Sequence, residues 1–353
     1  SDLVCRLGGD EFIIVLEQIN SAQNASLVAQ KIAATLSEPF EINHHKFLLS
    51  ASIGIASYPE DGTDSETLLK NADMAMYHAK EQGKSTYRFY RQEMNTKVKK
   101  RLFLEKNLRE ALKQEQFEVY YQPKLLTADK RICGAEALVR WHHPQSGPIS
   151  PAQFIPLAEE MGLILPLGEW VLETAFQQTR SWQEAGFTPF RIAVNLSGVQ
   201  LRQAELPDIM RRILLETRLN PSSVELEVTE STLMEDVAIT TSNLHQLREL
   251  GICIAIDDFG MGYSSLSYLN RFPIDFLKID RSFIEDIGRG KGEIAKAVIA
   301  LAHSCGLAVT AEGVETKTQA AFLEEHHCEE LQGFLYGKPM PAADFTTLLA
   351  RQR

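Results

Sequence analysis

The chain has 353 residues, of which 44% are hydrophobic and 24% are charged, and its 36 basic and 47 acidic residues give a formal net charge of −11. This length favours about two domains, and the composition is that of a globular protein, which excludes disordered, collagen-like and low-complexity classes. The acidic balance disfavours a broad basic face for a nucleic-acid polymer, although a local anion site remains compatible with it.

The five cysteines are dispersed and form no CxxC pair. Such a set is typical of reduced thiols in a cytoplasmic protein and not of a disulfide framework. No apolar run reaches the roughly 18 residues that a membrane helix requires, so we expect no membrane contact in this segment. A strand-like run begins within a few residues of Ser1. We therefore expect a fragment of a longer protein, located in the cytoplasm. A membrane-anchored parent whose cytoplasmic part contains this fragment is compatible with that expectation.

Residues 1–93 have the pattern of a small α+β domain. The segments 4–7 and 12–16 read as strands around Gly8-Gly9-Asp10-Glu11, because paired glycines followed by an acidic residue suit the positive φ angles of a hairpin. Apolar residues at helical spacing predict a helix over 27–36, and residues 47–55 read as a strand. Thr63-Asp64-Ser65-Glu66 predicts a capping box for a helix over 68–79 that Gly83 ends, and a last strand is expected at 86–90.

Residues 94–113 are predicted to form a helical linker, since they contain neither glycine nor proline. A basic cluster lies in this segment. We interpret it as the solvated face of a helix and not as a binding patch. Its members are Lys97, Lys99, Lys100 and Arg101.

Residues 114–353 contain short apolar runs that recur between helical segments. The runs lie at 117–121, 132–139, 190–196, 224–228, 252–256, 274–277, 307–310 and 331–335. Helical patterns separate most of them, at 170–183, 206–217, 238–250 and 293–303. Eight strands alternating with helices over about 250 residues predict an α/β fold of the (β/α)8 TIM-like barrel type. A doubly wound open sheet is the alternative, although it would normally use fewer strands.

Polar side chains lie at or near the end of nearly every run after the first. In a parallel barrel all strand carboxyl ends open on one face, where active sites form, so these side chains are expected to meet at one mouth. In chain order they are Glu136, Arg140, Asn195, Glu227, Glu230, Asp257, Asp258, Lys278, Glu312 and Gln332.

The chemistry of this set points to hard cations. Like-charged carboxylates held within a few ångströms cost several kcal/mol unless they protonate or bind cations. Carboxylate and amide oxygens suit Mg²⁺ or Mn²⁺, whereas zinc favours His and Cys. Adjacent Asp257 and Asp258 allow one carboxylate to bridge two ions, which predicts two-metal hydrolysis of a phosphate ester. Lys278 would hold the attacking water or stabilise the charge of the transition state.

The structural alternative is that each strand-end carboxylate is merely solvated or salt-bridged, which is the usual case for a single one. Five on one rim, with Asn195, Lys278 and Gln332 in matching places, have no structural purpose in a core. Gly260-Met261-Gly262 and the polar residues after it match no phosphate-loop pattern, so we interpret them as a flexible loop.

At these residues the sequence resembles the EAL domains, a family of cyclic di-GMP phosphodiesterases, from about Leu102 to the C-terminus. Glu136-Ala137-Leu138-Val139-Arg140 is the motif that names the family, and the supporting motifs follow in order. They are Tyr121-Gln122-Pro123, Asn195-Leu196-Ser197, Glu227-Val228-Thr229-Glu230, Asp257-Asp258-Phe259-Gly260, Leu277-Lys278-Ile279-Asp280, Ala311-Glu312-Gly313-Val314-Glu315 and Gln332-Gly333-Phe334.

The resemblance implies a modified TIM barrel that hydrolyses cyclic di-GMP to linear pGpG with two Mg²⁺ or Mn²⁺ ions. By that resemblance, one ion is bound by Glu136, Asn195, Glu227 and Asp257 and the other by Asp257, Asp258 and Glu312. Lys278 contacts the nucleophilic water. The residues it implies for the dinucleotide site are Gln122, Leu138, Arg140, Gln332, Glu315 and Pro341, with Arg140 on phosphate. Glu230 anchors the loop 259–266, which couples the metal site to the interface of a homodimer.

The segment Gly8-Gly9-Asp10-Glu11-Phe12 resembles the second half of a GGDEF domain, the diguanylate cyclase family. The half that carries the other metal-binding Asp is not in this chain, so cyclase activity is not expected from these residues alone. Two alternatives to an active phosphodiesterase stay open. One is a catalytically silent cyclic di-GMP receptor that signals to a partner, and the other is a bifunctional protein whose cyclase activity needs the upstream half.

Overall fold

The computed structural model describes residues 2–17, 19, 22–43, 45–81, 85–234, 236–260, 272–288 and 290–352. The chain divides into two compact units, Ser1–Lys106 and Asn107–Arg353, and each is described here by itself. Among the helices of the described residues, none is both long and apolar enough to cross a membrane.

The first unit begins with the predicted hairpin. Strand β1 (Leu3–Gly8) pairs antiparallel with β2 (Glu11–Val15). Gly9 turns the chain between them with φ +55°, a left-handed conformation that glycine adopts without steric cost. The prediction of a strand, a glycine turn and a second strand is confirmed.

The rest of the first unit consists of α1 (Ala22–Ser37), β3 (Phe40–Ile42), β4 (His45–Phe47), β5 (Ile53–Ile55), α2 (Ser65–Glu81) and β6 (Tyr87–Phe89). The predicted single strand over 47–55 is wrong. Its two ends pair with different partners, since β4 is antiparallel to β3 whereas β5 is parallel to β6. The apolar run between them is exposed, with Leu48 76% accessible, so it covers no core. Gly83, the predicted end of the helix, lies outside the described residues.

The capping-box pattern predicted Thr63 as the N-cap of helix α2. The structure shows that Asp64 caps the helix instead. The Asp64 carboxylate accepts hydrogen bonds from the backbone N–H and from the hydroxyl of Thr67, both at 2.8 Å. A carboxylate at this position also favours the positive end of the helix dipole. The helix packs closely on β5 at Gly54, where a Cβ atom would lie 1.9 Å from the Ala72 carbonyl oxygen. Only glycine permits this approach.

The predicted linker is helical. It lies within α3 (Gln92–Lys113), the helix in which the first unit ends and the second begins. Arg101 and Glu105 form an ion pair at 2.9 Å along one side of this helix. Leu108 and Ala111 at its end are fully buried. The helix therefore has a packed end and a more polar beginning.

Eight strands close into a barrel in the second unit, as predicted. They are β7 (Phe117–Leu126), β8 (Ile132–His143), β10 (Arg191–Asn195), β11 (Val224–Thr229), β12 (Cys253–Phe259), β13 (Phe276–Ile279), β14 (Ala308–Ala311) and β15 (Glu330–Gln332). The strands from β8 to β15 follow one another in parallel, and β7 closes the ring by pairing with both β15 and β8.

One strand departs from the regular parallel pattern. Strand β7 is antiparallel to both of its neighbours, β8 and β15. The reason is the connection to β8, which spans only residues 127–131. Parallel neighbours need a crossover of about a dozen residues or more, whereas antiparallel neighbours can be joined by a short turn. The ring is therefore a modified TIM barrel with one reversed strand.

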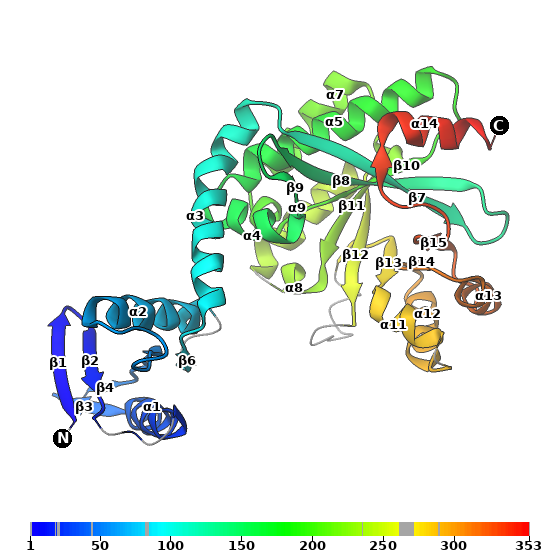
Figure 1. The fold of residues 1–353 in the computed structure, drawn as a ribbon. Coiled ribbons are helices and arrows are strands. Elements are labelled where there is room, and N and C mark those ends of the chain that lie inside the picture. Colours follow the sequence, from blue (N-terminus) through cyan, green and yellow to red (C-terminus); the bar gives the residue numbers. More distant parts are fainter. Residues whose placement is uncertain are drawn as a thin grey trace. The chain divides into compact units, whose positions relative to one another are not determined.

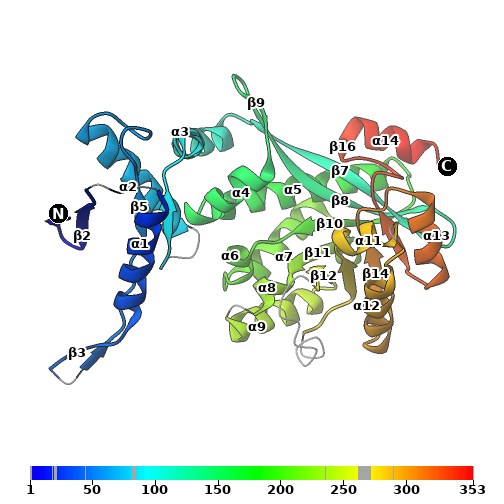
Figure 2. The ribbon, with the colours of Figure 1, turned by 60° about the horizontal axis from the view of Figure 1, so that its bottom comes forward.

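Helices lie outside the strands of the barrel (Figures 1 and 2). The longer ones are α5 (Ile164–Glu184), α7 (Leu206–Thr217), α9 (Val237–Glu249), α12 (Glu293–Ser304), α13 (Lys317–Glu325) and α14 (Ala342–Ala350). Shorter elements are β9 (Gly147–Ile149), α4 (Pro151–Glu160), α6 (Gly198–Leu201), α8 (Glu230–Leu233), α11 (Arg281–Ile287) and β16 (Met340–Pro341). The four helices predicted from apolar spacing are confirmed as α5, α7, α9 and α12.

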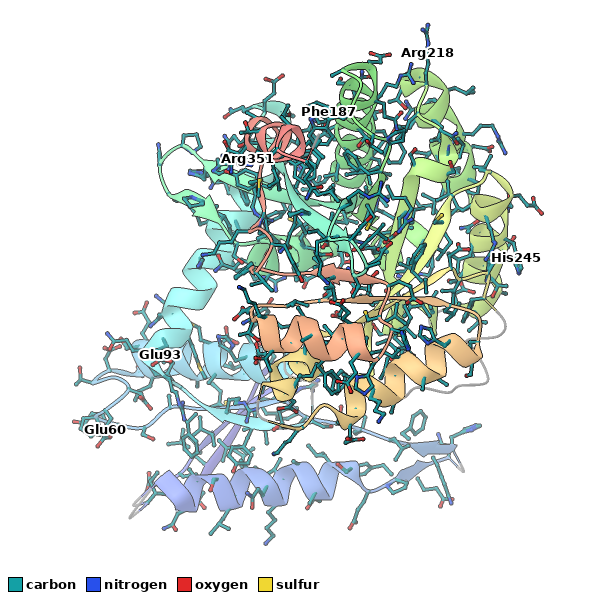
Figure 3. The ribbon with its side chains drawn as sticks, turned by 90° about the vertical axis from the view of Figure 1, so that its right-hand side faces the viewer. Glu60, Glu93, Phe187, Arg218, His245 and Arg351 are labelled. Carbon is teal, nitrogen blue, oxygen red and sulfur yellow. The ribbon has the colours of Figure 1, made fainter. Side chains whose placement is uncertain are left out.

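Apolar and aromatic side chains pack between the strands and these helices, as the side-chain view shows (Figure 3). Trp182 of α5 is the centre of one such cluster, with its ring 4.9 Å from Tyr121, 5.1 Å from Phe345 and 5.7 Å from Phe190. Its indole N–H donates to the Thr346 hydroxyl at 2.7 Å, so this buried donor is paired. This cluster fastens α14 and α5 onto β7.

Candidate active site

The strands deliver most of the predicted polar residues to one mouth of the barrel. Because β8 and the strands from β10 to β15 are parallel, their carboxyl ends open on the same face. The residues contributed there by successive strands or by the positions just after them are Glu136, Asn195, Glu227, Asp257, Asp258, Lys278, Glu312 and Gln332.

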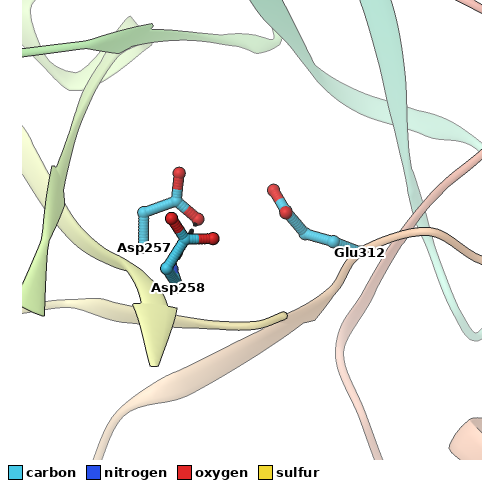
Figure 4. A group of neighbouring side chains, drawn as sticks. All are labelled: Asp257, Asp258 and Glu312. Atoms are coloured by element: carbon cyan, nitrogen blue, oxygen red, sulfur yellow. Dashed lines mark hydrogen bonds between the residues drawn. The ribbon is translucent and has the colours of Figure 1, made fainter. Parts of the chain in front are cut away.

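A bulge at the end of β12 explains how two adjacent aspartates serve one site. The register between β12 and β13 shifts between Ile256 and Phe259, and Asp258 has a left-handed backbone with φ +52°. In a regular strand, neighbouring side chains would point to opposite faces. Here each of Asp257, Asp258 and Glu312 offers an oxygen atom within 4.8 Å of the other two (Figure 4).

Glu136 is held by two amides. The Asn195 side-chain N–H₂ donates to its Oε1 at 2.6 Å, and the Gln332 N–H₂ donates to its Oε2. The same Gln332 nitrogen donates to Gln122 Oε1 at 3.2 Å, and Gln122 donates to the Gly337 carbonyl. The side-chain oxygen of Gln332, Oε1, is buried and has no hydrogen-bond partner among the described residues. The site therefore offers one further oxygen acceptor.

Lys278 lies among three of the carboxylates and is completely buried. Its Nζ is 2.6 Å from Glu227 Oε2, 2.5 Å from Glu312 Oε1 and 3.2 Å from Asp257 Oδ1. Burial opposes its charge, but the surrounding carboxylates hold the pKa of Lys278 well above its ordinary value. This lysine therefore stays protonated at neutral pH.

The carboxylates differ in their affinity for protons. Burial raises the pKa of Glu136. Burial is also the main cause that raises the pKa of Glu312 to about 8; Lys278 opposes this shift and the neighbouring carboxylates add to it. Burial and the adjacent Asp257 raise the pKa of Asp258. Burial acts in the same direction on Glu227, but the two lysines that contact it lower its pKa to about 2. Burial is the largest cause of each raised pKa, and neighbouring carboxylates add to it.

The charge and the donor chemistry fit divalent cations. With all five carboxylates ionised, as metal binding requires, and one ammonium group, the cluster would carry four net negative charges, which two divalent ions would neutralise. All donors are carboxylate or amide oxygens, the ligands that Mg²⁺ and Mn²⁺ prefer. The residues present therefore fit the predicted pair of ions.

A pocket of about 110 Å³ adjoins this cluster. Leu138, Arg140 and Asn195 line it, together with apolar side chains such as Ile155 and Val171. The Arg140 guanidinium lies over the Tyr120 ring, 5.5 Å from its centroid. A flat apolar group with an anion at its edge would suit these walls.

Three predicted residues lie away from the carboxylate cluster. Glu315 is exposed and pairs with Arg281 at 3.1 Å. Pro341 is in β16, where it pairs with Tyr120, the residue whose ring Arg140 covers. Glu230 accepts the backbone N–H of Gly260 at 3.3 Å, at the start of the predicted loop. Residues 261–266 of that loop lie outside the described part of the chain.

Sequence reasoning missed Lys124 and Glu225. Lys124 is buried in β7 with its ammonium group 2.6 Å from oxygens of both Glu225 and Glu227. The sequence does hold a signal for them: Glu225 and Glu227 are two residues apart in one strand, and residues i and i+2 of a strand share a face. An acidic pair on one buried face of β11 requires a cation nearby.

The family model "EAL domain" matches residues 105–339, and the model "Diguanylate cyclase, GGDEF domain" matches residues 1–86. This chain belongs to the EAL-domain family. The N-terminal unit is a GGDEF part, and the EAL domain is the barrel. Both assignments agree with the resemblance seen in the sequence.

Known relatives match both the GGDEF part and the EAL domain of this chain. The chain is 47% identical to "Bifunctional diguanylate cyclase/cyclic di-GMP phosphodiesterase MucR" of Pseudomonas aeruginosa, over 99% of this chain and 51% of that protein. It is 43% identical to "Cyclic di-GMP phosphodiesterase NbdA" of the same species, over 100% of this chain and 45% of that protein. The chain thus spans about half the length of these relatives.

A solved structure resembles the EAL domain closely. It is "PaMucR Phosphodiesterase, c-di-GMP complex", with 48% sequence identity and a TM-score of 0.66, and the match covers 69% of this chain and 99% of that one. The likeness agrees with the TIM-like barrel of the EAL domain described above.

Proposed function

We propose that this EAL domain is a phosphodiesterase that hydrolyses cyclic di-GMP to linear pGpG with two bound Mg²⁺ or Mn²⁺ ions. The observation that carries the proposal is the approach of Asp257, Asp258 and Glu312, whose oxygens lie within 4.8 Å of one another beside Glu136 and Glu227. The names of the relatives, which are cyclic di-GMP phosphodiesterases, support the choice of substrate.

The proposed ligands divide into two sets. Glu136, Asn195, Glu227 and Asp257 would hold one ion, and Asp257, Asp258 and Glu312 would hold the other. When bound, the ions would activate a water molecule and neutralise the phosphate charge. The hydrogen bonds from Asn195 and Gln332 fix the orientation of Glu136 before any ligand arrives.

Lys278 is the proposed partner of the attacking water. Its ammonium group stays charged, and its three N–H donors face three carboxylates. A carboxylate that turned to a bound ion would free one donor, which would orient the water and support charge on the phosphorus oxygens. The water oxygen forms a bond to phosphorus and the water gives up one proton, the bond from phosphorus to the 3′ oxygen breaks, and that oxygen takes up one proton, so that overall one water molecule is added. The product is linear pGpG.

The pocket beside the ions would receive the nucleotide. Leu138 and the apolar side chains around it suit one face of a guanine base, and Arg140 suits a phosphate group. Gln122 and Gln332 would contribute hydrogen bonds at the opposite side, since a Gln332 oxygen is left unpaired. Glu315 and Pro341 would support the rim.

A homodimer through the barrel is part of the proposal. Glu230 binds the backbone at Gly260, the point where the loop 259–266 leaves β12. The resemblance to EAL domains implies that this loop couples the metal site to the dimer interface. Analytical ultracentrifugation of the chain with and without nucleotide tests this part.

The experiment that tests the function is incubation with cyclic di-GMP and either ion, followed by chromatography of the products. Conversion to pGpG with Mg²⁺ or Mn²⁺, and none after chelation, is the expected result. Glu136→Ala is the matched control, because it removes a proposed ligand and should abolish conversion. Tight nucleotide binding by the unchanged chain with no product would indicate a receptor instead.

A cyclase activity of the longer protein is a second candidate. It is favoured by the exposed hairpin tip, where Gly9 and Asp10 form the turn of the GGDEF part, and by the bifunctional name of the relative MucR. Turnover of GTP by a protein that includes the upstream sequence tests it.

A further inference from the structure

A second layer of charged side chains lies inside the barrel, next to the metal-binding mouth. Lys124 of the reversed strand β7 is its first member and is 1% exposed. Its Nζ lies 2.6 Å from Glu225 Oε1 and 2.6 Å from Glu227 Oε1. One lysine thus joins a proposed metal ligand to a glutamate that is not one.

The layer continues across the barrel. Arg191 Nε lies 3.0 Å from the other oxygen of Glu225, and the same guanidinium pairs with Glu330. The Thr310 hydroxyl donates to Glu330 at 3.2 Å. Two positive and two negative side chains therefore balance one another, and the layer needs no bound ion.

Stability alone is a weak reason for such a layer. Buried ion pairs pay a large desolvation penalty, and well-packed hydrophobic residues often stabilise a core equally well or better. What an ion pair does provide is orientation, because each hydrogen bond fixes the position of one oxygen atom.

The two carboxylate oxygens of Glu227 face different lysines. Oε1 is held by Lys124, and Oε2 faces Lys278, which lies among the carboxylates of the mouth. Lys278 also contacts Asp257 and Glu312, so it does not fix Glu227 alone. Among the residues that the structure describes, the Lys124 ammonium group contacts no other proposed ligand, and it is itself fixed by Glu225.

We propose that Lys124 is a positioning residue for the metal site. It holds one oxygen of Glu227 from inside the barrel and so leaves the other oxygen directed to the mouth, where a divalent ion binds. The inference rests on the proposed function, since Glu227 is a ligand only in that proposal. Partners behind metal ligands typically change metal affinity about 10–100-fold when they are removed.

The test measures Mn²⁺ binding to the whole chain without nucleotide, by titration calorimetry. Lys124→Met keeps the length of the side chain and removes the charge, and we expect a loss of about 10–100-fold in affinity. Arg191→Met is the matched control. It breaks the same buried layer but leaves Lys124 on Glu227, so its Mn²⁺ affinity should stay within about twofold of the original.

Equal losses in both variants would overturn the inference, because the layer would then act only through the stability of the barrel. Unchanged affinity in Lys124→Met would overturn it too. If that variant does not fold, Lys124→Met combined with Glu225→Gln removes one charge of each sign, and the same criterion applies. Failure of the unchanged chain to bind Mn²⁺ would instead count against the proposed function.

Discussion

Lys278 and Glu227 face each other inside the barrel with 2.6 Å between Nζ and Oε2, and both side chains are fully buried. The pair is held from both ends, since Glu227 also binds Lys124 and Lys278 also binds Glu312. Neither side chain can be removed without leaving an uncompensated charge, which costs about 3–5 kcal/mol in a protein interior. Chemistry and folding therefore depend on the same contacts here.

Lys278→Ala should lower kcat about 10²–10⁴-fold while KM for cyclic di-GMP changes little, because the proposed contact is to the attacking water and not to the nucleotide. Steady-state kinetics on protein with a native circular dichroism spectrum checks this. Arg211→Ala is a suitable control, since Arg211 is an exposed residue on the outer helix α7. Equal losses in kcat and in substrate affinity would contradict the role of Lys278.

Asp258→Asn should separate metal binding from folding. Asparagine tolerates the left-handed backbone at φ +52°, so the bulge is retained. The lost charge removes a proposed ligand of the second ion, and the affinity for that ion should fall at least tenfold. Calorimetric titration with Mn²⁺ and thermal unfolding are the measurements. A fall in thermal stability with unchanged Mn²⁺ binding would refute the assignment.

Metal binding should strengthen as the pH rises toward 8. Burial raises the pKa of Glu312 to about 8, so below that pH its carboxyl group is protonated in the metal-free protein. An ion requires the ionised form and must displace the proton. The affinity for Mn²⁺ should therefore increase from pH 6 to pH 8 and level off above it, with proton release at the lower pH.

Calorimetry at pH 7 in two buffers of different ionisation enthalpy counts the protons that metal binding releases. Glu312→Gln is the matched variant, because it keeps the shape and removes the titrating group. It should bind more weakly and release fewer protons. A release that is the same in both proteins would assign the proton to another group.

Trp182→Ala should destabilise the barrel by about 3–5 kcal/mol, because it opens a cavity among Tyr121, Phe190 and Phe345 and leaves the Thr346 hydroxyl without its donor. Trp182→Phe retains most of the packing and should cost less. Chemical denaturation followed by circular dichroism measures both. A loss below about 1 kcal/mol in the alanine variant would show that the aromatic cluster is not a stabilising centre.

The sequence predicted the barrel and its mouth because both depend on repetition. Strand-length apolar runs with polar ends identify the strands, and parallel order brings Glu136, Asp257 and Glu312 to one face without further information. The reversal of β7 was also readable, since residues 127–131 are too few for a crossover.

Other features could not be predicted from local pattern. The bulge that brings Asp258 beside Asp257 depends on how β12 meets β13. The contact of Lys124 with Glu227 joins strands far apart in the chain. In the first unit, the run over 47–55 is apolar throughout, but strand formation needs a partner, and its two halves found different ones. Such pairing is a tertiary property that apolar spacing does not encode.

The reversed direction of β7 has a geometric consequence for whatever precedes the barrel. Phe117, its first residue, pairs with Trp141, which lies beyond Glu136 toward the carboxyl end of β8. In an all-parallel ring the polypeptide would enter at the opposite end. Here it enters at the end of the barrel on which the carboxylates open, and α3 ends shortly before that point. A displacement of the end of α3 would therefore reach this end of the barrel and not the opposite one.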